Sequence, residues 1–179
     1  MTENVMNSEL NSKLKLWDGV HTEYLTELYG VNSLSLDFFE NLVAICVNEQ
    51  DLQKTATWLI KHHYDNGQKL PGLLTERLLT SCKTVENWEA KLHLLQLLPY
   101  FKLTNKSIII TEDFTRKCLE DNNKFVKAWA YNGLYVLTKY IPELTTELEF
   151  ICQRAMETES AAIKSRVKKI LLAINKRRK

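Results

Sequence analysis

The stretch VKAWAYNGLYVL at residues 126–137 decides the fold, because its apolar pattern recurs three more times along the chain. Counting from Val126, small or apolar residues fall four, eight and eleven positions later, which is the spacing of one face of an α-helix. Matching segments begin at Leu52, Ala90 and Ile163, so the steps between the four segments are 38, 36 and 37 residues. A fixed period of this length is typical of helical repeat proteins and predicts an all-α fold.

Two further series of positions recur with the same period, at steps of 36 or 37 residues. They lie upstream of the segments described above and do not depend on the first pattern. The shared period therefore predicts that every repeat contains a pair of helices. The two series are Leu42, Leu78, Phe114 and Ile151, and Cys46, Cys82, Cys118 and Ala155.

These patterns predict four helix pairs. Pro71 and Pro142 fall in the first turns of predicted helices, where a missing amide hydrogen costs nothing. The stretch 107–111 is locally strand-like, with Thr111 as a candidate cap for the helix that follows. The first helices lie near residues 35–48, 71–84, 108–120 and 142–157, and the second near residues 51–65, 86–101, 123–140 and 160–176.

A separate helix is predicted over residues 8–29, ahead of the pairs, because its apolar side chains are spaced by four and three residues. At 179 residues the chain is long enough for one well-buried domain and short for two, so 1–179 is predicted to be a single domain. The apolar face of the first helix consists of Leu10, Leu14, Trp17, His21, Tyr24 and Leu28. The four repeats cover residues 35–66, 71–101, 107–140 and 142–176.

Residues 121–134 resemble the second helix of a HEAT repeat, which belongs to the armadillo-type α-solenoids. The resemblance rests on Asp121, on the apolar Val126 five residues later, and on the basic Lys127 beside it. It implies a right-handed α-α superhelix of about four HEAT-like pairs, capped by the N-terminal helix. It also implies that Asp121 and Lys127 belong to the charged pairs that stack between neighbouring repeats. The other repeats depart from the motif at Gln53, Val85 and Thr158.

The composition argues against several classes of protein. Five glycines leave little from which to build a phosphate-cradling loop, and no Gly-x-Ser-x-Gly or His-Glu-x-x-His motif occurs. We therefore expect no enzymatic activity and no cofactor. The N-terminus lacks the apolar segment of a secretion signal, and no apolar run approaches the ~18 residues of a membrane span. A cytoplasmic location without membrane contact is the resulting expectation.

Four cysteines occur, three of them at repeat-equivalent positions. Equivalent positions on neighbouring packed helices lie about 8–10 Å apart. This spacing is too large for a disulfide or for a shared zinc ion, whose Zn–S bonds are ~2.3 Å. We predict that Cys46, Cys82 and Cys118 fill small slots in the core. His62 and His63 point about 100° apart on a helix, so they do not make a metal site either.

Charged residues divide between the two helices of each predicted pair. The first helices carry glutamates turned away from the core, which form either an acidic stripe or an ordinary solvated face. The second helices present lysines and aromatic residues on the row that lines the concave surface of HEAT-like folds. We therefore predict a non-enzymatic scaffold that binds a partner protein or an acidic peptide through a basic, aromatic concave face. The glutamates are Glu40, Glu76, Glu112 and Glu149. The candidate binding residues are Lys54, Trp58, Lys61, Trp88, Lys124, Tyr131, Tyr135, Lys168 and Lys169.

Nucleic-acid binding is the alternative function, since lysines with interleaved aromatic residues also suit phosphates and bases. Some DNA glycosylases for alkylated bases are built from HEAT-like repeats and use a basic concave face. Their signature of consecutive tryptophans followed by Asp is absent, because the nearest stretch reads AWAYN at residues 128–132. Non-catalytic DNA or RNA binding therefore stays open. The basic residues 176–179 suit either phosphate contact or a solvated, frayed terminus.

Overall fold

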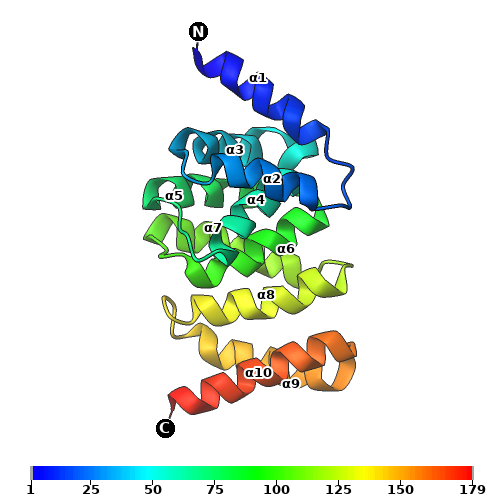
Figure 1. Cartoon of the computed structure of the whole chain (residues 1–179). Coiled ribbons are helices and arrows are strands. Elements are labelled where there is room, and N and C mark those ends of the chain that lie inside the picture. The colour runs from blue at the N-terminus through cyan, green and yellow to red at the C-terminus, as the bar shows by residue number, and fades with distance from the viewer. Residues whose placement is uncertain (1, 179) are drawn as a thin grey trace. The chain divides into compact units, whose positions relative to one another are not determined.

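The computed structural model describes the backbone of residues 2–178 and the side chains of residues 9–178. Over this range the chain forms ten α-helices and three short 3-10 helices (Figure 1). No strand occurs in the described residues, so the predicted all-α class is confirmed. The elements are α1 (Thr2–Lys15), α2 (Glu23–Asn32), α3 (Leu36–Asn48), η1 (Gln50–Leu52), α4 (Gln53–Asp65), α5 (Gly72–Thr80), η2 (Ser81–Lys83), α6 (Trp88–Leu97), η3 (Leu98–Tyr100), α7 (Asn105–Leu119), α8 (Lys124–Leu137), α9 (Leu144–Thr158) and α10 (Ala161–Arg177).

The chain forms two compact units, residues 1–93 and 94–179, with the boundary inside α6. In the first unit, α3 packs against α4 and α5, α1 contacts α3, and α2 lies against α4. In the second unit, α8 packs against α7, α9 and α10, and α9 packs against α10. The predicted partners α3 and α4, α7 and α8, and α9 and α10 are thus each in direct contact.

The predicted helix over residues 8–29 is wrong, because the chain turns between α1 and α2. The break covers residues 16–22. Here the Asp18 carboxylate accepts hydrogen bonds from the amides two and three residues later, both at 2.9 Å, and Gly19 adopts a φ of 82°. This left-handed conformation suits glycine and cannot continue a right-handed helix.

The same break shifts the buried face of the second helix by one residue. Leu25 and Tyr29 are buried, whereas Tyr24 and Leu28 are only half-buried. Trp17 lies in the turn, where its indole Nε1 donates to the backbone carbonyl four residues later at 2.7 Å. The apolar spacing that suggested one helix therefore runs across a turn.

The strand-like stretch 107–111 is helical, because α7 begins ahead of it with a capping box. Thr104 Oγ1 accepts a hydrogen bond from the Ser107 amide at 3.3 Å, and Ser107 Oγ accepts one from the Thr104 amide at 2.8 Å. This reciprocal cap outweighs the weak helix propensity of three successive isoleucines. Thr111 is buried inside the helix, so its predicted role as a cap is wrong.

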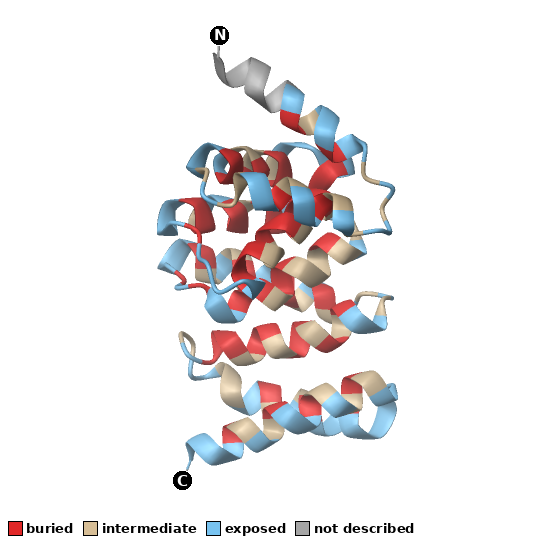
Figure 2. Ribbon diagram, viewed as in Figure 1, coloured by how far each residue is buried: buried red, intermediate tan, exposed pale blue. Residues whose placement is uncertain are grey.

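Burial confirms the repeat register. The positions equivalent to Val126, Ala130 and Leu137 are buried in all four repeats, including the one occupied by His63. The series on the first helices is buried as well, apart from Ile151, which is half-buried. Figure 2 shows buried residues spread along the helices of each unit. The period read from the sequence therefore identifies the core.

Candidate functional site

The candidate lysines of the first unit are already paired. Lys54 on α4 forms an ion pair with Glu89 at 2.7 Å and donates to the Gly19 carbonyl at 2.9 Å. Lys61, two turns further along α4, forms an ion pair with Asp65 at 2.5 Å. Because an opposite charge lies beside each ammonium group, these lysines offer little uncompensated charge to an acidic ligand.

The aromatic candidates of this unit differ in accessibility. Trp58 stacks on His62, with ring centroids 4.8 Å apart and planes 11° from parallel. Trp88, at the start of α6, is 41% exposed. One face of Trp58 is thus covered by the protein itself, whereas Trp88 is accessible.

A histidine that the sequence did not single out lies beside the paired lysines. His93 Nδ1 is 3.0 Å from Thr57 Oγ1, and that hydroxyl donates to the Gln53 carbonyl at 2.7 Å. Burial, together with the charges of Lys61 and Lys54, lowers the pKa of His93 to about 4. His93 is therefore neutral near pH 7 and adds no positive charge to this surface.

The lowered pKa of His93 predicts that acid destabilises the first unit. The unfolded chain binds a proton on this histidine near pH 6.5, whereas the folded chain resists protonation until about pH 4. The unfolded state therefore binds more protons in this window. Stability should fall, by on the order of 3 kcal/mol, as the pH drops from about 6.5 to about 4. Above about pH 6.5 this contribution is complete and no longer changes.

The check is the free energy of unfolding in urea at about pH 7 and about pH 5, for the wild type and His93→Gln. Glutamine keeps a polar side chain but binds no proton, so the variant should lose less stability in acid. The charges of Lys54, Lys61 and Asp65 act on the histidine and are present in both proteins, so the comparison isolates His93. Equal acid sensitivity would show that His93 is not the responsible group.

The second unit carries the unpaired cations among the candidates. Lys168 and Lys169 on α10 are exposed, and no described residue forms an ion pair or hydrogen bond with either ammonium group. Lys124, at the start of α8, is also exposed, with its ammonium group 5.2 Å from the centre of the Phe125 ring. These three lysines keep their charge available to solvent or to a ligand.

Tyr131 does not belong to an accessible surface. It is only 6% exposed, and it lines a pocket between α7, α8 and α9 together with Lys127 and Arg154. Burial raises the pKa of Tyr131 to about 12. Tyr131 is thus buried rather than on an open face, because α8 packs against three helices and is covered on more than its core face.

Two arginines that the sequence analysis missed lie over aromatic rings of this unit. The Arg166 guanidinium is 3.9 Å from the centre of the Trp129 ring, and that of Arg177 is 4.2 Å from the Tyr135 ring. Trp129 and Arg166 are 37 residues apart, which is one repeat. The repeat period therefore already indicated that Trp129 and Arg166 occupy equivalent positions on the second helices of neighbouring repeats.

The described part of the basic C-terminus is anchored rather than frayed. Arg177 donates to Thr138 Oγ1 at 3.2 Å. Arg178 forms two hydrogen bonds with the Glu149 carboxylate, both at 2.6 Å. These two arginines are exposed to solvent but hydrogen-bonded, so they are not frayed, while Lys179 lies outside the described residues.

The glutamate series on the first helices is partly neutralised. Arg116 pairs with Glu112 at 3.0 Å and with Glu147 at 2.6 Å. The hydrogen bond from Arg116 lowers the pKa of the Glu147 carboxyl. Glu149 is held by Arg178, whereas Glu40 is exposed. The glutamate series therefore includes both ion-paired and solvated acids.

Lys127 pairs across two successive helix pairs, although not with Asp121. Its ammonium group forms an ion pair with Glu159 at 2.5 Å. Glu159 precedes α10 and lies one residue beyond Thr158, where the motif expects the acid. Asp121 instead accepts a hydrogen bond from the Asn123 amide at 2.8 Å. The basic residue of the HEAT-like motif thus joins α8 to the start of the next second helix.

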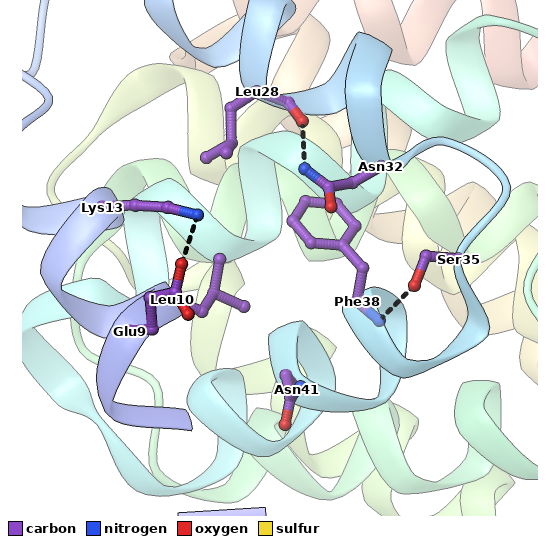
Figure 3. A pocket seen from close by; sticks show the side chains of 8 residues that line it. All are labelled: Glu9, Leu10, Lys13, Leu28, Asn32, Ser35, Phe38 and Asn41. Carbon is purple, nitrogen blue, oxygen red and sulfur yellow. Dashed lines mark hydrogen bonds and ion pairs between the residues drawn. The ribbon is translucent and has the colours of Figure 1, made fainter. Parts of the chain in front are cut away.

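A pocket of about 180 Å³ lies between α1, α2 and α3 (Figure 3). The Lys13–Glu9 ion pair, at 2.7 Å, lies on one side of it. Asn32 donates to the Leu28 carbonyl at 2.8 Å, and Ser35 accepts from the first turn of α3. Because several of its polar side chains already form hydrogen bonds or an ion pair within the protein, we assign this pocket no ligand. Its lining residues are Glu9, Leu10, Lys13, Leu28, Asn32, Ser35, Phe38 and Asn41.

The cysteines are core residues, and the repeat predicted this for Cys46, Cys82 and Cys118. All four are buried thiols. Burial raises the pKa of the Cys46 thiol, and it raises that of Cys152 to about 12. These thiols are therefore protonated and poorly reactive at neutral pH. No group of three or more potential metal ligands occurs in the described part of the chain.

No described helix is long and apolar enough to cross a membrane. Comparison with protein-family models, with curated proteins and with solved structures finds no match to this chain. Its function is therefore argued from the geometry and charge of its own residues.

Proposed function

We propose that the chain is a HEAT-like, right-handed α-solenoid that acts as a non-enzymatic binding module for an acidic partner protein. Packing within the units supports this architecture, since α3 contacts α5 and α8 contacts α10, as equivalent helices of neighbouring repeats do in a solenoid. The Lys127–Glu159 ion pair supports it as well, because it links one helix pair to the next.

The charge of α10 is the observation that carries the binding role. This helix contains six lysines and arginines and no acidic residue. Lys168, Lys169 and Lys176 are exposed and have no partner among the described residues, and we call these three lysines the α10 surface. Their charge is available to a ligand, whereas Lys54 and Lys61 are held by acids. The proposed contact therefore centres on α10.

An acidic protein segment fits this surface better than a single-stranded nucleic acid does. Bases bind proteins largely by stacking on exposed aromatic faces. Two of the candidate rings, and Trp129 as well, have a face covered by a side chain of this protein, which leaves less area for bases. The covered rings are Trp58 by His62, Trp129 by Arg166 and Tyr135 by Arg177. Binding of a nucleic-acid backbone through its phosphates is the second candidate function. A helix with basic residues and no acidic ones also attracts phosphates.

Charge reversal on the α10 surface should weaken binding of an acidic peptide. The probe is a short fluorescein-labelled peptide rich in glutamate, and its Kd is measured by fluorescence anisotropy at low salt. Lys168→Glu/Lys169→Glu places two negative charges against a negative ligand. We therefore expect the Kd to rise about tenfold or more. Added salt should also weaken binding to the wild type.

The matched control is Lys102→Glu/Lys106→Glu, which makes the same charge change at two exposed lysines near the start of α7. We expect its effect on the Kd to stay within about twofold, since long-range charge is screened. Equal weakening by both pairs would show that only net charge matters and would contradict the α10 surface. Tighter and more steeply salt-dependent binding of labelled oligonucleotides would favour the nucleic-acid alternative.

A further inference from the structure

Arg166 is a half-buried cation for which the second unit provides no acid. Its guanidinium is 3.9 Å from the centre of the Trp129 ring. No described residue forms an ion pair with it or accepts a hydrogen bond from it. A guanidinium carries five N–H donors, and those at its edge are not satisfied by an aromatic ring beneath its face.

Arg116, the other half-buried arginine among the described residues, provides the contrast. It is held by Glu147 at 2.6 Å and by Glu112 at 3.0 Å, and these hydrogen bonds raise its pKa. No acid acts on Arg166 in this way, and burial lowers its pKa. It nevertheless stays charged at neutral pH, because guanidinium pKa values lie far above 7.

A charge that is partly withdrawn from water without an opposite charge costs free energy. The Trp129 ring, 3.9 Å from the guanidinium, compensates in part and limits the positions that this group can take. An arriving carboxylate would supply the missing charge without first displacing an internal acid. Lys54 and Lys61 offer no such advantage, since each already has a carboxylate partner.

We propose that Arg166, held on Trp129, anchors an aspartate or glutamate side chain of the acidic partner. This inference rests on the proposed function and names the residue that makes the site specific for carboxylates. The edge of a guanidinium matches the two oxygens of a carboxylate and forms two parallel hydrogen bonds with it. Lys169, one turn further along α10, is exposed and adds attraction. The α10 surface thus draws the acidic segment in, and Arg166 fixes its position.

Arg166→Lys is the sharpest binding test, because lysine keeps the charge and loses the two-pronged geometry. We expect it to raise the Kd of the glutamate-rich peptide about tenfold, and Arg166→Gln to raise it at least as much. In NMR spectra of the wild type, the Arg166 Nε–Hε signal should shift during the peptide titration. The corresponding signal of Arg116 should stay in place, since its acids already occupy it.

The possible results separate this anchor from the proposed function. If Lys168→Glu/Lys169→Glu weakens binding but Arg166→Lys does not, and the Arg166 signal stays fixed, the anchor is wrong and the function stands. If the wild type does not bind the peptide, both are wrong. If an oligonucleotide moves the Arg166 signal and the peptide does not, the site takes a phosphate and the carboxylate assignment is overturned.

Thermal unfolding distinguishes an anchor from a structural residue. Arg116→Met should lower the Tm by a few degrees, because it leaves the half-buried Glu112 and the exposed Glu147 without their cation. Arg166→Met removes a charge that has no acid, so its Tm should be unchanged or higher. A loss as large as that of Arg116→Met would show that Arg166 serves packing on Trp129 and would overturn the proposal.

Discussion

Replacing Gly133 with valine should destabilise the second unit by about 3 kcal/mol or more. Gly133 lies on α8, and a Cβ atom added there would come within 2.9 Å of Thr115 Cγ2 and 3.0 Å of Thr115 Oγ1 on α7. It would also lie 3.3 Å from Leu98 Cδ1. Because Thr115 is completely buried, it has no space to move into, and the two helices must separate. Urea unfolding followed by circular dichroism measures the loss.

Gly30→Ala is the matched control, since Gly30 lies inside α2 and an added Cβ would meet nothing within 4 Å. It should raise the free energy of unfolding by about 0.5–1 kcal/mol, the usual gain in a helix interior. Gly133→Ala has the same gain in helix propensity but should still be destabilising, by about 1 kcal/mol or more. If both alanines stabilise the protein, α7 and α8 do not approach as closely as described.

A second substitution tests the cause of the Gly133 effect. Thr115→Ala removes both of the nearest atoms, so in the Gly133→Ala background it should restore part of the lost stability. The Thr115 hydroxyl is buried without a hydrogen-bond partner in the described structure, so its removal breaks no polar contact. The double variant should therefore be more stable than the sum of the single effects by about 0.5 kcal/mol or more. Strict additivity would mean that the clash lies elsewhere.

The core was predictable because equivalent positions of the four repeats are buried. A residue such as Ala90 has little signal alone, but it shares its position with Leu52, Val126 and Ile163, and all four are buried. The burial of one position is therefore predicted from four equivalent residues together, which is more reliable than a prediction from any one of them. The sequence could not show that Ile151 is only half-buried, because exposure depends on how the neighbouring helices cover one position.

The break between α1 and α2 was missed because apolar spacing and turn chemistry disagree there. The i, i+3, i+4 pattern continues from Leu14 through Trp17, whereas Asp18 and Gly19 form a turn. The Asp-Gly dipeptide is a strong turn signal, and it needed more weight than the loss of about 1 kcal/mol that a helical glycine costs. The hydrophobic pattern in this region reflects two short helices.

The pairing of the candidate lysines was predictable only in part. The Lys61–Asp65 pair is readable from its i, i+4 spacing, whereas Lys54 meets Glu89 only through tertiary packing. The burial of Tyr131 was not foreseen because the prediction gave each helix one buried face. That assumption fails for α8, which contacts three helices in its unit. Which cations stay unpaired is therefore a property of the fold.

Truncation of Leu134 should give the other large loss of stability, about 2–5 kcal/mol for Leu134→Ala. Leu134 is 2% exposed on α8. Removing its branched end therefore leaves a cavity that packed helices close only in part, and the lost contacts add to the lost burial. The free energy of unfolding in urea, compared with that of the wild type, gives the value directly.

Two further leucine and isoleucine truncations turn this prediction into a test of the register. Leu172→Ala, at a side chain that is 54% exposed, should change stability by no more than about 0.5 kcal/mol. Ile151→Ala should fall between the two, since Ile151 is half-buried. If Leu134→Ala costs less than about 0.5 kcal/mol, the rotation of α8 about its axis is wrong. The contacts of Gly133 and Trp129 depend on that same rotation, so the helix clash and the arginine anchor would lose their geometric basis together.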